Sequence, residues 1–241
     1  MAHCSRTVAD IKRSIRSGQY LNSKGTTEFY DCWAQTYEWD MMRIGYRPAH
    51  LAVDFLNANF CGRREEVQVL DVACGSGLVA KLMSELGFRH FVGVDGSKGM
   101  LDQAAGTGLY QDLRLALLGT EGLPAETGVF DVVILVSALS PGFAPVSVVR
   151  ELCHASKPGG FICIAKGSYP GAEEEIYKKD LERELQLMED EGLWSLVGIK
   201  PTDRYMENAF VTTEADGKDE QEERYIRGNV YLYKKSISTS I

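Results

Sequence analysis

The spacing of hydrophobic residues changes near Val67 of the 241-residue chain. Before that point, apolar side chains recur every three or four residues; Phe29, Trp33 and Tyr37, for example, share one helix face. This spacing predicts helices over residues 1–62. After Val67, short apolar runs alternate with helical patterns, which is typical of strands connected by helices.

Five apolar runs in this second part are predicted to be strands. In the first helix between them, Leu78, Leu82 and Leu86 are expected to form the buried face. Strands that alternate with helices form a parallel sheet with right-handed crossovers. The predicted strands cover residues 67–73, 91–96, 113–119, 129–139 and 161–165.

The alternation ends after the fifth strand. A charged helical pattern follows, and then come two strand patterns with no helix between them, for which an antiparallel pair is the simplest arrangement. These two strands are predicted at residues 194–199 and 229–235. The inward face of the charged helix is expected to contain Ile176, Leu181, Leu185 and Met188.

Together these patterns predict an α/β fold in a single domain covering residues 1–241. Residues 1–62 form an N-terminal helical cap, and residues 67–241 form a Rossmann-like core. The core is expected to be a doubly wound, three-layer α/β/α arrangement. Its mostly parallel seven-stranded sheet ends in the C-terminal antiparallel hairpin.

Composition narrows the choice of partners and compartment. The formal net charge of −8 repels phosphate backbones, so we expect no nucleic-acid partner. No apolar run approaches the roughly 20 residues that span a bilayer, and the first residues lack a signal-peptide core. We therefore expect no membrane partner, a monomer, and the cytoplasm as location, with the nucleus as the alternative. Six cysteines without a C-x-x-C pair and four scattered histidines indicate reduced thiols and no metal site.

The segment after the first predicted strand carries the candidate chemistry. Residues 75–80, Gly-Ser-Gly-Leu-Val-Ala, match the G-x-G-x-x-A pattern of nucleotide-binding loops, and Asp95 follows 20 residues after Gly75. An acid at the end of the second strand accepts hydrogen bonds from ribose hydroxyls, and glycines let the backbone approach a ligand closely. The pattern therefore predicts a nucleoside-containing cofactor.

Two cofactor classes use such a loop, and Asp71 separates them. This residue stands at the end of the first strand, where the pyrophosphate of a dinucleotide would oppose a carboxylate. S-adenosylmethionine has no phosphate and carries an ammonium and a sulfonium, which an acid attracts. The argument favours S-adenosylmethionine. The alternative is a nicotinamide dinucleotide, which would make the protein an NAD-dependent oxidoreductase.

The segments VLDVACGSG, FVGVDGSKGML, GTEGLP, FDVVILVSAL and KPGGFICIA follow one another between Val67 and Ala165. This series resembles the motifs of class I S-adenosylmethionine-dependent methyltransferases, and the predicted C-terminal hairpin and N-terminal aromatic helix resemble that family too. The resemblance implies the class I methyltransferase fold and methyl transfer from S-adenosylmethionine, with S-adenosylhomocysteine as product.

The resemblance also implies a role for individual residues. Asp71, Ala73 and Gly75 would line the methionine end, and Asp95 would bind both ribose hydroxyls unless it only caps the following helix. The residues expected to bind the cofactor are Trp33, Tyr37, Asp71, Ala73, Gly75, Gly77, Asp95, Gly96, Ser97, Met100, Thr120, Glu121, Val136 and Ser137.

Two parts of this set differ from the rest. Thr120 stands where many family members have an aspartate that accepts from the adenine amino group, and its hydroxyl is a weaker acceptor. Trp33 and Tyr37 are expected from the cap because aromatic faces attract a sulfonium, and ordinary core packing is their alternative. The weaker candidates, including an arginine for the cofactor carboxylate, are Tyr30, Arg43, Tyr46 and Arg47.

No general base stands out in the sequence. His50 and Tyr46 are the remaining candidates. The N/D-P-P-Y signature of adenine methylation is absent, and VSALSPGF takes its place. We expect a small-molecule or protein methyl acceptor, with the small molecule favoured because the cap and hairpin are moderately apolar. A non-catalytic cofactor-binding interaction module is the second alternative, and the missing acid at Thr120 is its sequence support.

Overall fold

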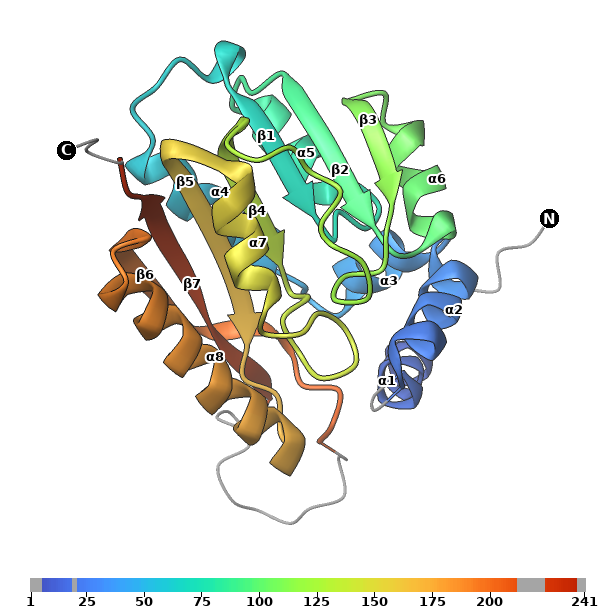
Figure 1. Cartoon of the computed structure of the whole chain (residues 1–241). Coiled ribbons are helices and arrows are strands. Elements are labelled where there is room, and N and C mark those ends of the chain that lie inside the picture. Colours follow the sequence, from blue (N-terminus) through green and yellow to red (C-terminus); the bar gives the residue numbers. More distant parts are fainter. Residues whose placement is uncertain (1–5, 19–20, 212–223, 238–241) are drawn as a thin grey trace.

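The computed structural model describes residues 6–18, 21–211 and 224–237, and it contains a seven-stranded sheet with helices on both faces (Figure 1). The strand order is β3-β2-β1-β4-β5-β7-β6. Strands β1 to β5 are parallel, and β7 is antiparallel to both β5 and β6. This confirms the predicted fold class, hairpin included. The strands are β1 (Gln68–Val72), β2 (His90–Asp95), β3 (Tyr110–Leu115), β4 (Phe130–Val136), β5 (Ser156–Gly167), β6 (Trp194–Glu207) and β7 (Tyr225–Lys235).

The helices form two outer layers and a cap. On one face of the sheet, α4 and α5 pack with Val69, Val132 and Ile134; on the other, α7 and α8 pack with Val133 and Leu135. Inner strands with two covered faces are mostly apolar, and β4 is apolar at every position except Asp131. The helices are α1 (Val8–Ser17), α2 (Ser23–Trp33), α3 (Tyr37–Arg43), α4 (Pro48–Asn59), α5 (Leu78–Glu85), α6 (Lys98–Gly106), α7 (Val148–Ala155) and α8 (Ala172–Asp190), with a short 3₁₀ turn at Arg64–Glu66.

The cap helices are fixed to the core by polar contacts. Asp31 on α2 accepts hydrogen bonds from the Ser97 hydroxyl at 2.6 Å and from the Gly99 amide at 2.8 Å, at the first turn of α6. A Cβ atom at Gly99 would lie 2.9 Å from the Asp31 carbonyl oxygen, so glycine permits this close approach. Lys81 on α5 pairs with Glu38 on α3 at 2.7 Å. These contacts hold the cap beside the carboxyl ends of the strands (Figure 1).

Several local predictions were wrong. The aromatic segment was expected to be one helix but forms two, since α2 ends at Trp33 and α3 begins at Tyr37. The rings of Trp33 and Tyr37 still pack together, with centroids 5.2 Å apart. The third strand ends at Leu115, four residues earlier than predicted. An edge strand has only one buried neighbour, so its pattern is weak, and the apolar residues after it belong to a loop.

Two helix faces were also misassigned by about one residue. In α5 the residues with the least exposure are Val79, Ala80 and Met83, which face both the sheet and α4, whereas Leu86 follows the helix end and is exposed. In α8 the inward residue of the first turns is Tyr177, and Ile176 is 61% exposed. The rest of the predicted α8 face is buried. Neighbouring apolar residues in a short helix leave its orientation ambiguous, and tertiary packing decides it.

Candidate active site

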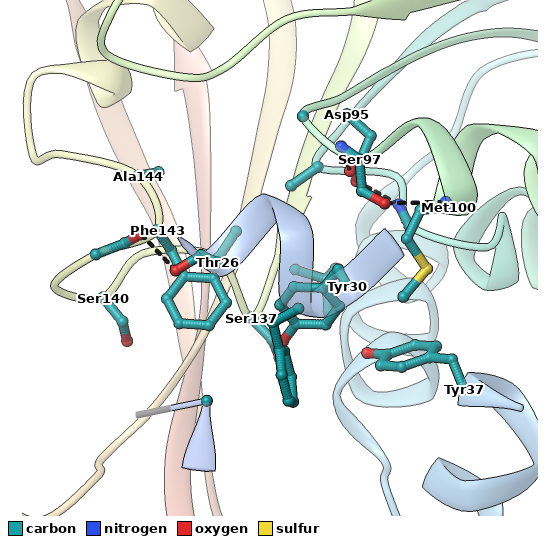
Figure 2. A pocket seen from close by; sticks show the side chains of 18 of the residues that line it. Thr26, Tyr30, Tyr37, Asp95, Ser97, Met100, Ser137, Ser140, Phe143 and Ala144 are labelled. Atoms are coloured by element: carbon teal, nitrogen blue, oxygen red, sulfur yellow. Dashed lines mark hydrogen bonds between the residues drawn. The ribbon is translucent and has the colours of Figure 1, made fainter. Parts of the chain in front are cut away.

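A cavity of about 250 Å³ lies at the carboxyl ends of β1, β2 and β4, beneath the cap helices. The strand order reverses between β1 and β4, and ligands of open α/β sheets bind at such a switch point. Figure 2 shows Asp95, Ser97 and Met100 on one side, Ser140, Phe143 and Ala144 on the other, and Tyr30 and Ser137 between them. Of the fourteen predicted binding residues, those that line the cavity are Trp33, Tyr37, Ala73, Gly75, Asp95, Gly96, Ser97, Met100, Val136 and Ser137.

The loop after β1 has an unusual backbone. Ala73, Gly75 and Gly77 all have positive φ, at 55°, 53° and 90°. A Cβ at Gly75 would meet no atom within 4 Å, so this residue borders open space into which a ligand atom fits. Gly77 does not line the cavity; a Cβ there would lie 3.1 Å from the Tyr110 ring. Glycine is needed here because φ is positive and because the start of α5 lies close against Tyr110 of β3.

Asp95 organises this side of the cavity. Its Oδ2 accepts from the Gly75 amide and its Oδ1 from the Ser97 amide, both at 2.8 Å. Burial raises the pKa of the carboxyl group, although these backbone hydrogen bonds act in the opposite direction. The N-cap of α6 is Ser97, whose Oγ accepts from the Met100 amide at 3.1 Å, so the alternative that Asp95 is the cap is wrong. A carboxylate has about four acceptor positions, which leaves Asp95 room for two further donors.

Asp71 does not line the cavity. It is 1% exposed, and its Oδ2 accepts a hydrogen bond from the Tyr110 hydroxyl at 2.6 Å. Burial raises the pKa of Asp71 to about 7; the bond from Tyr110 opposes this shift, and the charge of Asp95 adds to it. Asp71 therefore lies beneath the loop that starts at Ala73. In this position it can orient the loop, but it does not face a ligand in the cavity.

Thr120 and Glu121 lie outside the cavity as well. The Thr120 hydroxyl donates to the Leu117 carbonyl at 2.8 Å, and both residues are exposed. Because β3 ends early, the chain leaves the sheet before this segment, and Gly119 turns it with φ of 82°. Leu117 and Leu118 line the cavity in their place.

The cap contributes an aromatic wall. Tyr30 and Trp33 stack with centroids 6.1 Å apart, and both line the cavity together with Tyr37. Trp33 is also held from behind, since its Nε1 donates to the buried carboxylate of Asp40 at 2.7 Å. The same carboxylate accepts from the Thr36 hydroxyl and from Arg6, which fixes the corner between α2 and α3.

On the other side of the cavity, few residues apart from Ser137 were expected from the sequence. Ser137 has φ of 61° directly after β4, and its hydroxyl lies 2.6 Å from that of Tyr205. Residues after β5 and at the end of β6 also line this side, as expected where neighbouring strands end at one sheet edge. That rule could have found Tyr169, which lies two residues after the end of β5. The lining residues not predicted as binding residues include Ser140, Phe143, Tyr169, Glu174, Met206 and Phe210.

The charged side chains that line the cavity in the described residues are all acidic. Among the residues that the structure describes, no lysine, arginine or histidine lines it, so the expected arginine for a cofactor carboxylate is not found there. Arg43, Arg47 and His50 are exposed and lie outside the lining, which removes His50 as a base. Tyr46 does line the cavity, but burial raises its pKa to about 12, so its hydroxyl stays protonated at neutral pH.

Two further features are absent from the residues that the structure describes. Residues 6–18, 21–211 and 224–237 contain no helix that is both long and apolar enough to cross a bilayer. Within the same ranges, no three histidine, cysteine, aspartate or glutamate side chains come together as metal ligands.

The sheet order, the hairpin and the switch-point cavity define the class I methyltransferase fold. A family model described as "Methyltransferase domain" matches residues 70–164. The chain is also 44% identical over 176 residues to Methyltransferase-like protein 27 of Homo sapiens, covering 73% of this chain and 71% of that protein. The chain therefore belongs to the methyltransferase family of enzymes, as the sequence motifs indicated.

Two further proteins are similar to this chain, one a solved structure of the same fold and one a relative that matches over a shorter segment. The S-adenosylmethionine-dependent methyltransferase from Mesorhizobium loti matches with a TM-score of 0.54 at 15% identity, covering 78% of this chain and 100% of that chain, which shows the shared fold. The 18S rRNA (guanine-N(7))-methyltransferase of Bos taurus is 37% identical over 89 residues, which are 37% of this chain and 27% of that protein.

The second relative corrects one expectation. We excluded nucleic acid as a partner because the net charge is −8, but a relative named for methylation of rRNA shares part of this chain. The exclusion was wrong because the summed charge of a chain does not fix the potential at one surface. Acceptor binding depends on local groups, and these differ between proteins with the same fold.

Proposed function

We propose that this enzyme binds S-adenosylmethionine on the Asp95 side of the cavity and transfers its methyl group to a small molecule on the opposite side. The observation that carries this proposal is the arrangement of Asp95 and the Gly75 loop. A partly exposed carboxylate with free acceptor positions stands next to a glycine that borders open space. This arrangement suits a ribose and the chain attached to it.

The charges near the loop favour this donor over a dinucleotide. Asp95 lines the cavity at the carboxyl end of β2, Asp31 lies close to it beside Ser97, and no basic side chain of the described residues lines the cavity. A pyrophosphate would meet uncompensated negative charge there. A sulfonium is a cation, and aromatic faces such as those of Tyr30 and Tyr37 attract cations by about 0.5–2 kcal/mol.

The chemistry needs little from the protein beyond placement. When bound, S-adenosylmethionine supplies a methyl group on a positively charged sulfur that is already a good leaving group. The residues of this chain then orient the partners and exclude water, and holding two reactants in line supplies several kcal/mol, by order of magnitude. Val136 and Ser137 lie at the centre of this arrangement, at the end of β4.

A small acceptor is favoured because the cap closes onto the core. The Thr26 hydroxyl on α2 donates to the Gly142 carbonyl at 3.1 Å in the loop after β4. A Cβ at Gly142 would lie only 2.3 Å from the Leu21 carbonyl oxygen, so the cap and this loop are in close contact. The cavity lies between them and is partly covered, and a partly covered cavity of about 250 Å³ suits a small molecule better than a long polymer.

Two measurements test the proposal. Calorimetry should show binding of S-adenosylhomocysteine and no binding of NADH; binding of NADH alone would support the oxidoreductase alternative. In the second measurement, a cell extract is incubated with the protein and methyl-labelled S-adenosylmethionine, and is then separated into small molecules, protein and RNA. We expect the label in small molecules. Label only in protein or RNA would refute the small acceptor, and no labelled product at all would favour the non-catalytic interaction module.

A further inference from the structure

The side of the cavity opposite Asp95 contains one carboxylate. Glu174 belongs to the first turn of α8, its side chain is 12% exposed, and it lines the cavity. Its Oε2 accepts from the Nζ atom of Lys166 at 3.0 Å, and the same Nζ donates to the Leu139 carbonyl at 2.8 Å. Lys166 does not line the cavity. A molecule on this side therefore meets Glu174, whose ion-pair partner Lys166 lies outside the lining.

The other lining groups on this side are mainly aromatic. Phe143 follows β4, Tyr169 follows β5, and Phe210 follows β6, and all three line the cavity. Aromatic rings attract cations, and a carboxylate in a poorly hydrated place attracts them more strongly. An acceptor with its own carboxylate or phosphate would meet Glu174, and the Lys166 ammonium group that could offset the repulsion is already paired with Glu174 and donates to the Leu139 carbonyl.

The same set of residues restricts the nucleophile. An aliphatic alcohol needs a base to become nucleophilic. The hydroxyls of Tyr46 and Tyr169 cannot supply one at neutral pH, because burial raises both pKa values, that of Tyr46 to about 12. The Glu174 carboxylate is a poor base as well, because it is already paired with the Lys166 ammonium group at 3.0 Å. An amine carries its own lone pair once it has lost a proton to water, so it needs no base from the protein.

Building on the proposed function, we propose that the acceptor is a small amine with an apolar body, and that its amino group contacts Glu174. The free amine attacks the methyl carbon, so that an N–C bond forms as the C–S bond breaks. The electron pair of the broken bond remains on sulfur and gives neutral S-adenosylhomocysteine. The positive charge moves to the methylated nitrogen, beside Glu174.

The test uses the full chain, methyl-labelled S-adenosylmethionine and a cell extract limited to small molecules. The products are passed over a cation exchanger at pH 6. Unreacted S-adenosylmethionine is itself a cation and is retained, so its peak is identified with a standard and left out of the count. We expect the remaining label, which is product, to be retained on the exchanger as well. Label only in the unretained neutral and anionic fraction overturns the amine and leaves methyl transfer intact. Absence of label from small molecules overturns the proposed small acceptor and this inference with it.

A variant and a matched control locate the contact. Glu174→Gln should lower the rate of label transfer to the retained product at least tenfold. Its affinity for S-adenosylhomocysteine should stay within twofold, which also reports on folding. Glu173→Gln changes an exposed neighbour in the same turn and should leave both quantities unchanged. Equal rates for Glu174→Gln and the unaltered protein would overturn the role of Glu174.

A measurement on the unaltered protein covers the case in which Glu174→Gln does not fold. 2-Phenylethylamine and 3-phenylpropionate have similar size and opposite charge. In the presence of S-adenosylhomocysteine, we expect the amine to bind at least tenfold more tightly than the acid by calorimetry. Equal binding of the two, or tighter binding of the acid, would overturn the inference.

Discussion

Asp95 is the residue on which ligand binding should depend most, and Asp95→Ala tests this directly. In the structure, each of its carboxylate oxygens accepts one backbone amide, from Gly75 and from Ser97. Two acceptor positions remain for the two ribose hydroxyls. A hydrogen bond to a charged group contributes about 1.5–3 kcal/mol, and 1.4 kcal/mol corresponds to a factor of ten. Loss of both bonds at the lower figure weakens binding by about 3 kcal/mol, or more than 100-fold.

The substitution also removes the support of the Gly75 loop, so the assay has to separate the two effects. Isothermal titration with S-adenosylhomocysteine is compared with titration of an analogue that lacks both ribose hydroxyls. If Asp95 binds the ribose, the substitution weakens the natural ligand far more than the analogue. Asp102→Ala, an exposed acid on α6, is the control and should change neither affinity. An equal loss for the two ligands would show that Asp95 acts on the loop alone and would refute the ribose contact.

Three further predictions concern the structure around the site. Burial raises the pKa of Asp71 from 3.8 to about 7, so between these pH values the folded state binds more protons than the unfolded state, and stability falls by roughly 4 kcal/mol as the pH rises from about 4 to 7. In denaturant titrations Asp71→Asn should remove this part of the dependence of stability on pH, and an unchanged dependence would contradict the prediction. Gly99→Ala should destabilise the protein by more than about 1 kcal/mol and weaken S-adenosylhomocysteine binding, because the new Cβ would meet the Asp31 backbone. Gly106→Ala has open space around it and should be neutral or stabilising, and equal effects of the two substitutions would argue against tight contact between the cap and α6. Trp33→Phe leaves the buried Asp40 without one donor and should cost about 1–3 kcal/mol in thermal or chemical unfolding, and a loss below about 0.5 kcal/mol would show that Thr36 and Arg6 suffice.

The sheet and the loop after β1 were predictable because their signals are local. The apolar run of β4, the glycines at 75 and 77 and the acid at the end of β2 each specify a strand end or a turn without reference to distant residues. The C-terminal hairpin followed from the missing crossover helix. Each of these inferences uses residues that are near one another in the chain, and each agrees with the structure.

Predictions that depended on distant packing were less successful. Whether Tyr177 or Ile176 points inward depends on where α8 meets the sheet, and the spacing of apolar residues along the helix is compatible with either one. Thr120 was placed in the site from a motif position, but its location depends on where β3 ends and on the turn at Gly119. Glu174 gave no signal because it is one of three consecutive glutamates, and only its ion pair with Lys166 distinguishes it.

The burial of Asp71 changes how the acid at the end of β1 is understood. The sequence argument gave it a direct role in attracting a cation, yet its carboxylate is covered and bonded to Tyr110. The Tyr110 ring also lies close to Gly77, since a Cβ atom added at Gly77 would be 3.1 Å from it. One tyrosine therefore joins the acid below the loop to the turn that begins α5. Since Asp71 immediately precedes Val72 and the strained Ala73, this contact fixes the start of the loop, and the charge that faces the ligand is left to Asp95. An acid at the end of β2 suits the ribose of either donor, so the choice between donors rests on the absence of basic side chains from the described lining, and the first acid acts through the shape of the loop.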